Sequence, residues 1–470
     1  MAIPRAAKEL GRAPVGYMLF RYSMPAIIGM LVMIFYNVVD RLYVSHAVGE
    51  AGLAGFALTF PLSMITIAFG TLIGIGTATQ VSIAMGKGKR DVARCYLGQS
   101  VCIYLFFSLI LFPAIALFLE PILAVTGGTP ASIPYAVDYL QIYLCGTIFQ
   151  YGSFGINGIL RAEGSPKTAL FMMLLGAVIN LIADPFFIFD AVPLYFFKAP
   201  GLGWGIQGAA VATVLGQACA AIFTIIHFLR PSATIRLKLG YIKVYRPLVW
   251  GVLAVGVAPF ALNIMGSIVN MLYNILFKYW AATDAEANLQ IASIGIIMTV
   301  QMVVAMPVFG LAQGMQPIVG FNYGAKNYKR LLHAYTLAKW YAGAYVFIMA
   351  LLTILFRHTI IGLFCNETTS TDLLEFGPTA LLIFFCGFFF VGYAIIVGQY
   401  FQSIGRSGIS IIMSLSRQCT ILIPLMIIMP LFFGSIGIWW AVPISDILSI
   451  LIALWFDIRE HRRIHTLMAS

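Results

Sequence analysis

The chain has 470 residues, of which 61% are hydrophobic and only 10% are charged, and its mean hydropathy is +0.94. A soluble chain of this length would contain far more charged residues. The net charge of +11 could suggest a nucleic-acid partner. The Lys and Arg residues, however, are spread over alternate loops instead of forming one patch. Composition therefore excludes a soluble fold and predicts an all-α integral membrane protein.

Twelve apolar stretches along the chain are long enough to cross a bilayer. They lie near residues 22–44, 53–85, 95–119, 132–160, 167–190, 204–229, 247–278, 287–321, 332–356, 376–404, 409–433 and 436–457. Basic residues occupy both termini and every second loop, and an excess of Lys and Arg marks the cytoplasmic side. Both termini are therefore expected in the cytoplasm, which requires an even number of spans, as twelve is.

An internal repeat relates the two halves of the chain. Four pairs of landmarks lie at offsets of 232 to 238 residues: Pro25 with Pro259, Asp40 with Asn274, Gly86 with Gly324, and Gly205 with Gly437. The repeat predicts two pseudo-symmetric six-helix bundles around a central cavity. The N-terminal lobe would cover residues 1–229, the cytoplasmic linker 230–246 and the C-terminal lobe 247–470. Repeats of this kind are typical of secondary transporters.

The first lobe carries acidic residues inside predicted spans. Asp40 lies in the first span, where a charge costs roughly 2.5–3.5 kcal/mol on insertion scales. Asn180 and Asp184 are four residues apart in the fifth span, so they share one face of a helix at a depth similar to that of Asp40. Two carboxylates at one depth suit the binding of a proton or a small cation. A structural polar contact between helices is the other interpretation.

Four stretches of the sequence resemble the multidrug and toxic compound extrusion (MATE) family, in particular its bacterial MepA-type subgroup. They are YNVVDRLYVSHAVGEAGLAG (36–55), ILRAEGSPKTALFMMLLGAVINLIADPFFIF (159–189), GIQGAAVATVLGQ (205–217) and PVFGLAQGMQPIVGFNYGAKNYKR (307–330). The resemblance covers nearly the whole chain. It implies a MATE-like antiporter in the bacterial inner membrane that exports amphipathic, often cationic compounds against protons or sodium ions.

Carried over residue by residue, the resemblance places a cation site in the first lobe on Asp40, Asn180 and Asp184. Thr213 and Tyr139 are weaker matches. Some members of the family bind sodium in the second lobe through a Glu in the seventh span and an Asp in the tenth. Here the seventh span has only hydroxyl and amide groups, and the tenth has no acid. Proton coupling through the first lobe is therefore expected, with sodium coupling as the alternative.

The second lobe contains one Arg and one Asp inside neighbouring spans. Arg417 lies in the eleventh span and Asp446 in the twelfth, and the two spans are joined by a short turn around Gly434. At a rise of 1.5 Å per residue, antiparallel helices would bring the two side chains to within roughly one turn of each other in depth. We therefore predict a buried ion pair between Arg417 and Asp446. Its role is either structural or functional.

The sequence says little about the substrate. Candidate residues of the substrate cavity are Met33, Met64, Asn157, Met173 and Asn274. Flexible thioethers suit a promiscuous pocket, but methionine is equally an ordinary packing residue. The expected partners are small amphipathic molecules and membrane lipid, with no nucleic acid, no metal and no cofactor besides the coupling ion. The protein is expected to be a monomer.

Two other classes of function remain open. A lipid-linked oligosaccharide flippase of the same superfamily would need a cavity lined by many Arg and Lys residues to hold a pyrophosphate, and intramembrane cations are few here. A channel or an integral-membrane enzyme is the second class. An enzyme would need clustered His, Cys or acidic residues, and no such cluster is evident in the sequence, so no enzymatic activity is expected.

Overall fold

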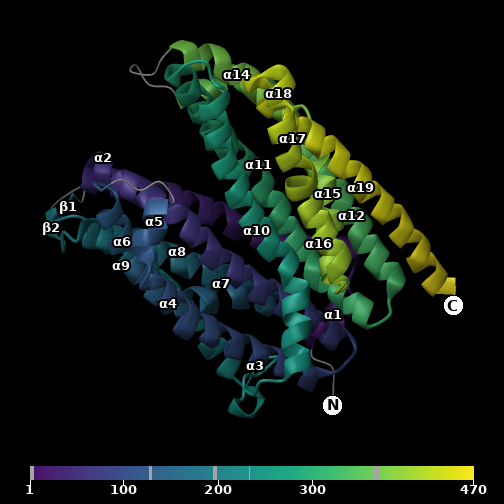
Figure 1. Cartoon of the computed structure of the whole chain (residues 1–470). Helices are drawn as coiled ribbons and strands as arrows, with labels where there is room; N and C mark the ends of the chain where they lie inside the picture. The colour runs from purple at the N-terminus through teal and green to yellow at the C-terminus, as the bar shows by residue number, and fades with distance from the viewer. Residues whose placement is uncertain (1–4, 126–129, 194–197, 232, 365–370, 470) are drawn as a thin grey trace. The chain divides into compact units, whose positions relative to one another are not determined.

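The computed structural model describes residues 5–125, 130–193, 198–231, 233–364 and 371–469 (Figure 1). Contacts between Cα atoms divide the chain into two compact units. Unit 1 comprises Met1–Arg12 and Ile28–Gly256, and unit 2 comprises Ala13–Ile27 and Val257–Ser470. The units therefore differ from the predicted lobes in two segments, because residues 13–27 pack in unit 2 and residues 230–256 pack in unit 1.

Nearly all of the described chain in unit 1 is helical. Its elements are α1 (Arg5–Arg12), most of α2 (Val15–Gly86), α3 (Arg90–Phe106), the π-helix η1 (Phe107–Leu111), α4 (Phe112–Ala116), α5 (Leu119–Val125), α6 (Ile133–Cys145), α7 (Thr147–Ala162), α8 (Pro166–Ile188), α9 (Gly205–Leu229) and the 3-10 helix η2 (Leu239–Tyr241). A short antiparallel pair, β1 (Ala191–Pro193) and β2 (Lys198–Pro200), follows α8, with Val192 opposite Ala199.

Unit 2 is built in the same way from helices. Its elements are α10 (Arg246–Trp280), which begins in unit 1, α11 (Asp284–Gly324), α12 (Tyr328–Leu355), α13 (Arg357–Gly362), α14 (Thr371–Phe385), the 3-10 helix η3 (Phe388–Phe390), α15 (Val391–Ser403), α16 (Ser407–Leu415), the π-helix η4 (Ser416–Leu422), α17 (Ile423–Ile428), α18 (Pro430–Phe433) and α19 (Ser435–Ala469). The structure therefore confirms the all-α fold class.

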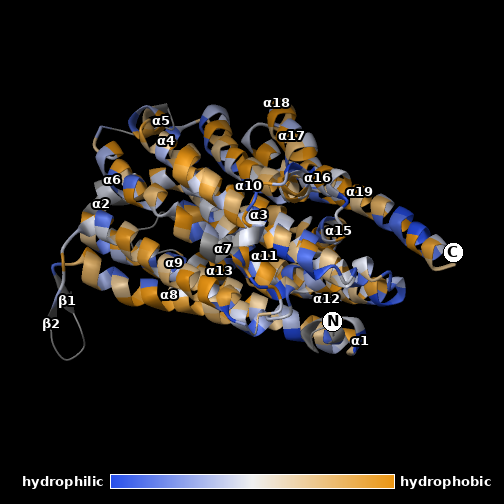
Figure 2. Ribbon diagram, turned by 90° about the horizontal axis from the view of Figure 1, so that it is seen from below, coloured by the Kyte–Doolittle hydropathy of each residue, from blue (hydrophilic) through white to orange (hydrophobic). Residues whose placement is uncertain are grey.

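Within the described residues, ten helices are long and apolar enough to cross a membrane, or eleven when the pair Asp372–Phe385 and Phe388–Ser403, bent by 45°, counts as one span. These correspond to eleven of the twelve predicted segments. The remaining segment, 132–160, folds as α6 and α7, which have 13 and 16 residues and meet at Gly146. Apolar residues cover most of the helical surface, whereas the C-terminal end of α19 is hydrophilic (Figure 2).

Local sequence explains where the longest helix of unit 2 begins. The Thr283 hydroxyl accepts a hydrogen bond from the backbone N–H of Glu286 at 3.2 Å. The Glu286 carboxylate in turn accepts one from the N–H of Ala282 at 2.9 Å. The first bond satisfies one of the N–H groups that a helix leaves unpaired in its first turn, and the second ties the preceding residue to the same turn. Together they fix the start of α11 at Asp284, within the turn predicted between the seventh and eighth spans.

The N-terminal part of α2 packs closely against α11 within unit 2. Gly310 and Gly314 are spaced four residues apart on α11 and face Ile27 and Ser23. A Cβ atom on Gly314 would lie 2.5 Å from Cα of Ser23, closer than any real side chain is found. The Ser23 hydroxyl also donates to the Leu311 carbonyl at 3.4 Å. Small residues at this spacing let membrane helices approach closely.

Substitution of Gly314 by Ala is therefore expected to destabilise unit 2. The added methyl group meets the backbone of α2, so the helices must separate, and overpacking of this kind costs about 1–3 kcal/mol. Thermal unfolding of the purified protein in detergent measures the effect as a lower midpoint. Gly295→Ala is the matched control, because Gly295 lies on the same helix with no atom within 4 Å of the new Cβ. Equal midpoints for the two variants would contradict this account.

The segment after α9 is anchored to unit 1 by two buried polar side chains. The Gln99 amide donates to the Lys243 carbonyl and accepts from the Tyr245 N–H at 2.9 Å. The Glu163 carboxylate contacts His227 and accepts from the N–H of Ile235 at 3.3 Å. These contacts explain why the basic segment that follows α9 belongs to unit 1 and is not a free connection.

Candidate functional site

The structure brings four of the five predicted coupling residues of unit 1 into linked contacts. Asn180 and Asp184 lie one turn apart on α8, and the Asn180 Nδ2 donates to Asp184 Oδ1 at 3.1 Å. The same amide group lies 3.4 Å from the Thr213 hydroxyl of α9. Thr213 is also hydrogen bonded to Tyr139 of α6. Three helices therefore contribute to one polar group inside an apolar unit.

The fifth residue, Asp40, comes from α2 and lies within electrostatic reach of this group. Its charge acts on Asp184 and on the Tyr139 hydroxyl. Asp40, Asn180 and Asp184 are 6%, 4% and 1% exposed, so none of them faces lipid. The carry-over from the resembling family thus agrees with this spatial cluster. The sequence itself had indicated that Asn180 and Asp184 share one helix face and that Asp40 lies at a similar depth.

Sequence reasoning missed Tyr36, which lies one turn before Asp40 on α2. The charges of Asp40 and Asp184 both act on its hydroxyl group. Spacing of four residues on a helix places Tyr36 and Asp40 on the same face. That spacing, within the segment YNVVD, is the signal that could have found it.

The chemistry of this cluster is that of a cation site. Among the described residues, Asn180 Oδ1 and Asp184 Oδ2 are buried and have no hydrogen-bond partner. Buried polar atoms without a partner are costly, so each calls for an explanation, such as a bound ion. Oxygen atoms of this kind can accept a proton on the carboxylate or coordinate a hard cation. No group of three His, Cys, Asp or Glu residues within the described ranges could hold a metal ion.

The candidate residues for a substrate cavity do not form one group within a unit. Met33, Met64 and Met173 of unit 1 are half-buried, and the Met173 sulfur lies 2.7 Å from where a Cβ on Gly29 would be. Asn157 is buried, donates to the Ala169 carbonyl at 2.8 Å and also contacts Arg161. Asn157 therefore connects α7 to α8.

The remaining candidate, Asn274, belongs to unit 2, where it is exposed on α10. The other amides of this helix bond locally, because Asn270 donates to the Gly266 carbonyl at 2.9 Å. Nothing in this arrangement identifies a ligand, and the role of these residues in substrate binding stays a prediction.

The predicted ion pair of unit 2 is present. The Arg417 Nε lies 2.6 Å from Asp446 Oδ1, and the side chains are 23% and 0% exposed. Arg417 is located in the π-helix η4, an interruption of the eleventh span that the sequence did not predict. The wider π turn changes the direction in which residues before and after it face. Asp446 lies on α19 directly after Ser445, and both residues are fully buried.

Sequence reasoning also missed a polar cluster near the end of α19. The Asp457 carboxylate accepts from Lys339 at 2.7 Å and from the hydroxyl groups of Tyr335 and Tyr393 at 2.6 Å each. One turn later, Glu460 contacts Arg406 at 3.0 Å and Arg463 at 2.7 Å. The i,i+3 spacing of Glu460 and Arg463 was visible in the sequence. The partners on α12 and α15 were not, because they are distant along the chain.

Comparison with known proteins now assigns the chain to a family. The family model MatE matches residues 25–186 and 263–428. The chain belongs to the MatE family. The two matched segments start at corresponding points of the two halves, in agreement with the internal repeat. Solved structures with low sequence identity to this chain share its fold.

The chain is also similar to curated relatives over most of its length and to solved structures in fold. The chain is similar to "Multidrug export protein MepA" of Staphylococcus haemolyticus, at 25% identity over 444 residues that cover 93% of this chain and 92% of the relative. The same-named protein of Staphylococcus aureus is 25% identical over 94% of this chain and 93% of the relative. A transporter of the MOP superfamily from Pyrococcus furiosus is similar in fold, with a TM-score of 0.89, 23% identity and full coverage of both chains.

Proposed function

We propose that this MatE protein is a secondary active multidrug exporter of the bacterial inner membrane. It would export amphipathic, often cationic compounds against protons by alternating access, with both termini in the cytoplasm. Support comes from its family, from relatives named as multidrug export proteins and from its many apolar helices. The observation that carries the proposal is the buried group of Asp40, Asn180 and Asp184 in unit 1.

The coupling step follows from charge exchange at this group. When Asp40 or Asp184 takes up a proton, its attraction for a cationic substrate is lost, and the substrate is released. Loss of the proton to the other side of the membrane restores the negative charge. Both carboxylates are buried in surroundings of low dielectric constant. Their attraction for a cationic substrate is therefore stronger there than in water. Pro25, within α2, permits a change of helix direction during the cycle.

Sodium coupling is the second candidate. The observation that favours it is that Asn180 Oδ1 and Asp184 Oδ2 are both buried without a hydrogen-bond partner among the described residues. A carboxylate and an amide oxygen are suitable ligands for a hard cation. Proton coupling requires a pH gradient and sodium coupling requires a sodium gradient. Transport measured under each gradient alone therefore distinguishes the two ions.

Proteoliposomes loaded with a cationic dye are the test of the proposal. With a pH gradient alone, dye movement against its own gradient is expected, and a protonophore should abolish it. Removal of sodium should leave the rate unchanged. Transport that needs a sodium gradient and ignores the protonophore would replace proton coupling with sodium coupling. The absence of dye transport under both gradients would overturn the exporter assignment.

A further inference from the structure

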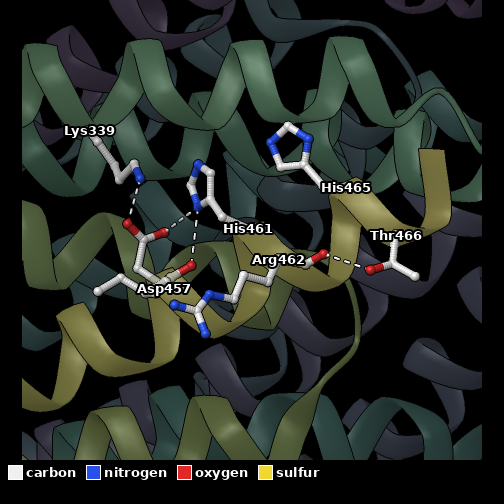
Figure 3. A pocket seen from close by; sticks show the side chains of 7 residues that line it. Lys339, Asp457, His461, Arg462, His465 and Thr466 are labelled. Atoms are coloured by element: carbon white, nitrogen blue, oxygen red, sulfur yellow. Dashed lines mark hydrogen bonds and ion pairs between the residues drawn. The ribbon is translucent and has the colours of Figure 1, made fainter. Parts of the chain in front are cut away.

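Unit 2 contains a cavity of about 640 Å³ that has no part in the proposed coupling site of unit 1. Its lining includes Lys339 of α12 and, from α19, Asp457, Ile458, His461, Arg462 and His465 (Figure 3). All the residues from α19 come from consecutive turns near the C-terminal end of the helix. These turns belong to the hydrophilic end of α19 seen in Figure 2.

The cavity lining offers more hydrogen-bond donors than acceptors. Asp457 is the one acid among the lining residues, and its carboxylate is already occupied. It accepts from Lys339 at 2.7 Å and lies 3.1 Å from His461 Nδ1, in addition to two tyrosine hydroxyl groups. Arg462 and His465 have no side-chain hydrogen bond or ion pair among the described residues. Their donors therefore remain available for an anion.

The geometry of these donors suits an anion with several oxygen atoms. A guanidinium group presents a planar set of N–H donors that matches phosphate, and hydrogen bonds between charged groups are the stronger ones. Arg462 and His465 are three residues apart on α19, so their side chains project from neighbouring positions of one helix face. Both are exposed, which leaves them accessible from outside the unit.

The position of the cavity along α19 corresponds to a membrane boundary. The exposed side chains of α19 are apolar through Leu451, Trp455 and Ile458, and the helix then turns basic at Arg459 and Arg462. The Arg459 guanidinium lies over the ring of Trp455, 5.5 Å from its centroid. Exposed Trp residues and Arg side chains gather where hydrocarbon meets headgroups.

The apolar wall favours a lipid over a soluble anion. Ile458 lines the cavity on the side of the apolar stripe, while Arg462 and His465 lie toward the basic end. A phospholipid presents a phosphate and an acyl chain in this order across the interface, whereas a free phosphate has no use for the apolar side. Basic pockets between membrane helices at the cytoplasmic interface are known to suit anionic headgroups.

We propose that this cavity binds the headgroup of an anionic phospholipid. Arg462 and His465 donate to the phosphate, and Ile458 contacts the start of an acyl chain. Asp457 holds Lys339 and His461 in place without repelling the ligand, because its own charge is balanced by these partners. The inference does not depend on which ion drives transport.

Native mass spectrometry of the full-length protein in detergent tests this inference. The protein is titrated with phosphatidylglycerol and with phosphatidylcholine of the same acyl chains. Phosphatidylglycerol should be retained in preference, and Arg462→Ala combined with His465→Ala should lower its retention about tenfold. Equal retention of the two lipids by the unsubstituted protein would overturn the proposal.

Arg459→Ala is the control for the loss of the Arg462 guanidinium, because it removes one guanidinium from the same helix without touching the cavity lining. Its retention of phosphatidylglycerol should stay within about twofold of the original, and a loss equal to that of the double variant would show attraction by surface charge alone. Addition of inorganic phosphate that displaces the lipid would assign the cavity to a soluble anion instead. Arg462→Gln, with a thermal midpoint measured beside it, repeats the test in a variant that keeps side-chain size.

Discussion

Replacement of Asp40 by Asn is expected to abolish substrate-driven proton release from proteoliposomes. Asn has nearly the same shape as Asp and keeps a hydrogen-bonding side chain, but it does not titrate. With one proton exchanged per cationic substrate, each unit of pH gradient supplies about 1.4 kcal/mol, enough for a roughly tenfold substrate gradient. The variant should maintain none, because we expect the exchange of proton for substrate to need both buried carboxylates, and only Asp184 can still titrate in the variant.

Two measurements keep this prediction specific. Substrate binding to the purified Asp40→Asn variant shows whether the protein still folds and recognises its cargo. Asp284→Asn makes the same chemical change at an exposed acid at the start of α11 and should retain full antiport. Undiminished antiport by the Asp40 variant would remove Asp40 from the coupling mechanism, whatever the role of its neighbours.

Replacement of Asp446 by Ala is expected to reduce the stability and folded yield of the protein strongly. The carboxylate is fully buried, and its loss leaves the Arg417 guanidinium without its partner at 2.6 Å. Removal of one member of a buried ion pair costs about 3–5 kcal/mol. The cost is smaller here to the extent that Arg417, at 23% exposure, reaches a polar environment.

A double-mutant cycle separates the pair from its surroundings. Arg417→Ala together with Asp446→Ala should unfold at a higher temperature than Asp446→Ala alone, because no unpaired charge remains. Asp91→Ala is the control at an exposed acid. Asp91 lies 2.8 Å from Arg94 and accepts from the Tyr241 hydroxyl at 3.2 Å, and exposed pairs contribute about 0–1 kcal/mol. Arg417→Ala alone completes the cycle, and a midpoint change in the double variant equal to the sum of the two single changes would show that Arg417 and Asp446 are not coupled.

The sequence predicts most of what depends on regular helices. A spacing of four residues placed Asn180 and Asp184 on one face, and the rise per residue brought Arg417 and Asp446 to one depth. Both expectations rest on geometry that is the same in every α-helix. The direction of the spans also placed Asp40 at the depth of Asn180 and Asp184. Thr213 and Tyr139 came instead from the family resemblance, because contacts between distant helices leave no periodic signal in one sequence.

Other features could not be predicted from the sequence, for a physical reason. The π-helix around Arg417 depends on how its span packs, since the same residues form an ordinary α-helix equally well. The partners of Asp457 come from α12 and α15, so only the packing of unit 2 reveals them. The continuation of α19 to Ala469, twelve residues past the predicted end, reflects polar residues that leave the membrane without ending the helix.

The distribution of the chain between the two units has a consequence for protein fragments. Division of the chain within the basic segment 230–246 would yield an N-terminal and a C-terminal fragment. Residues 13–27 would then lie on the N-terminal fragment, whereas Gly314, against which they pack, would lie on the C-terminal one. The same division would separate Gly256, where α10 meets the backbone of Leu72, from its own partner helix. Each half expressed alone would thus expose an unfilled helix groove, whereas the two halves made together could complement each other and assemble.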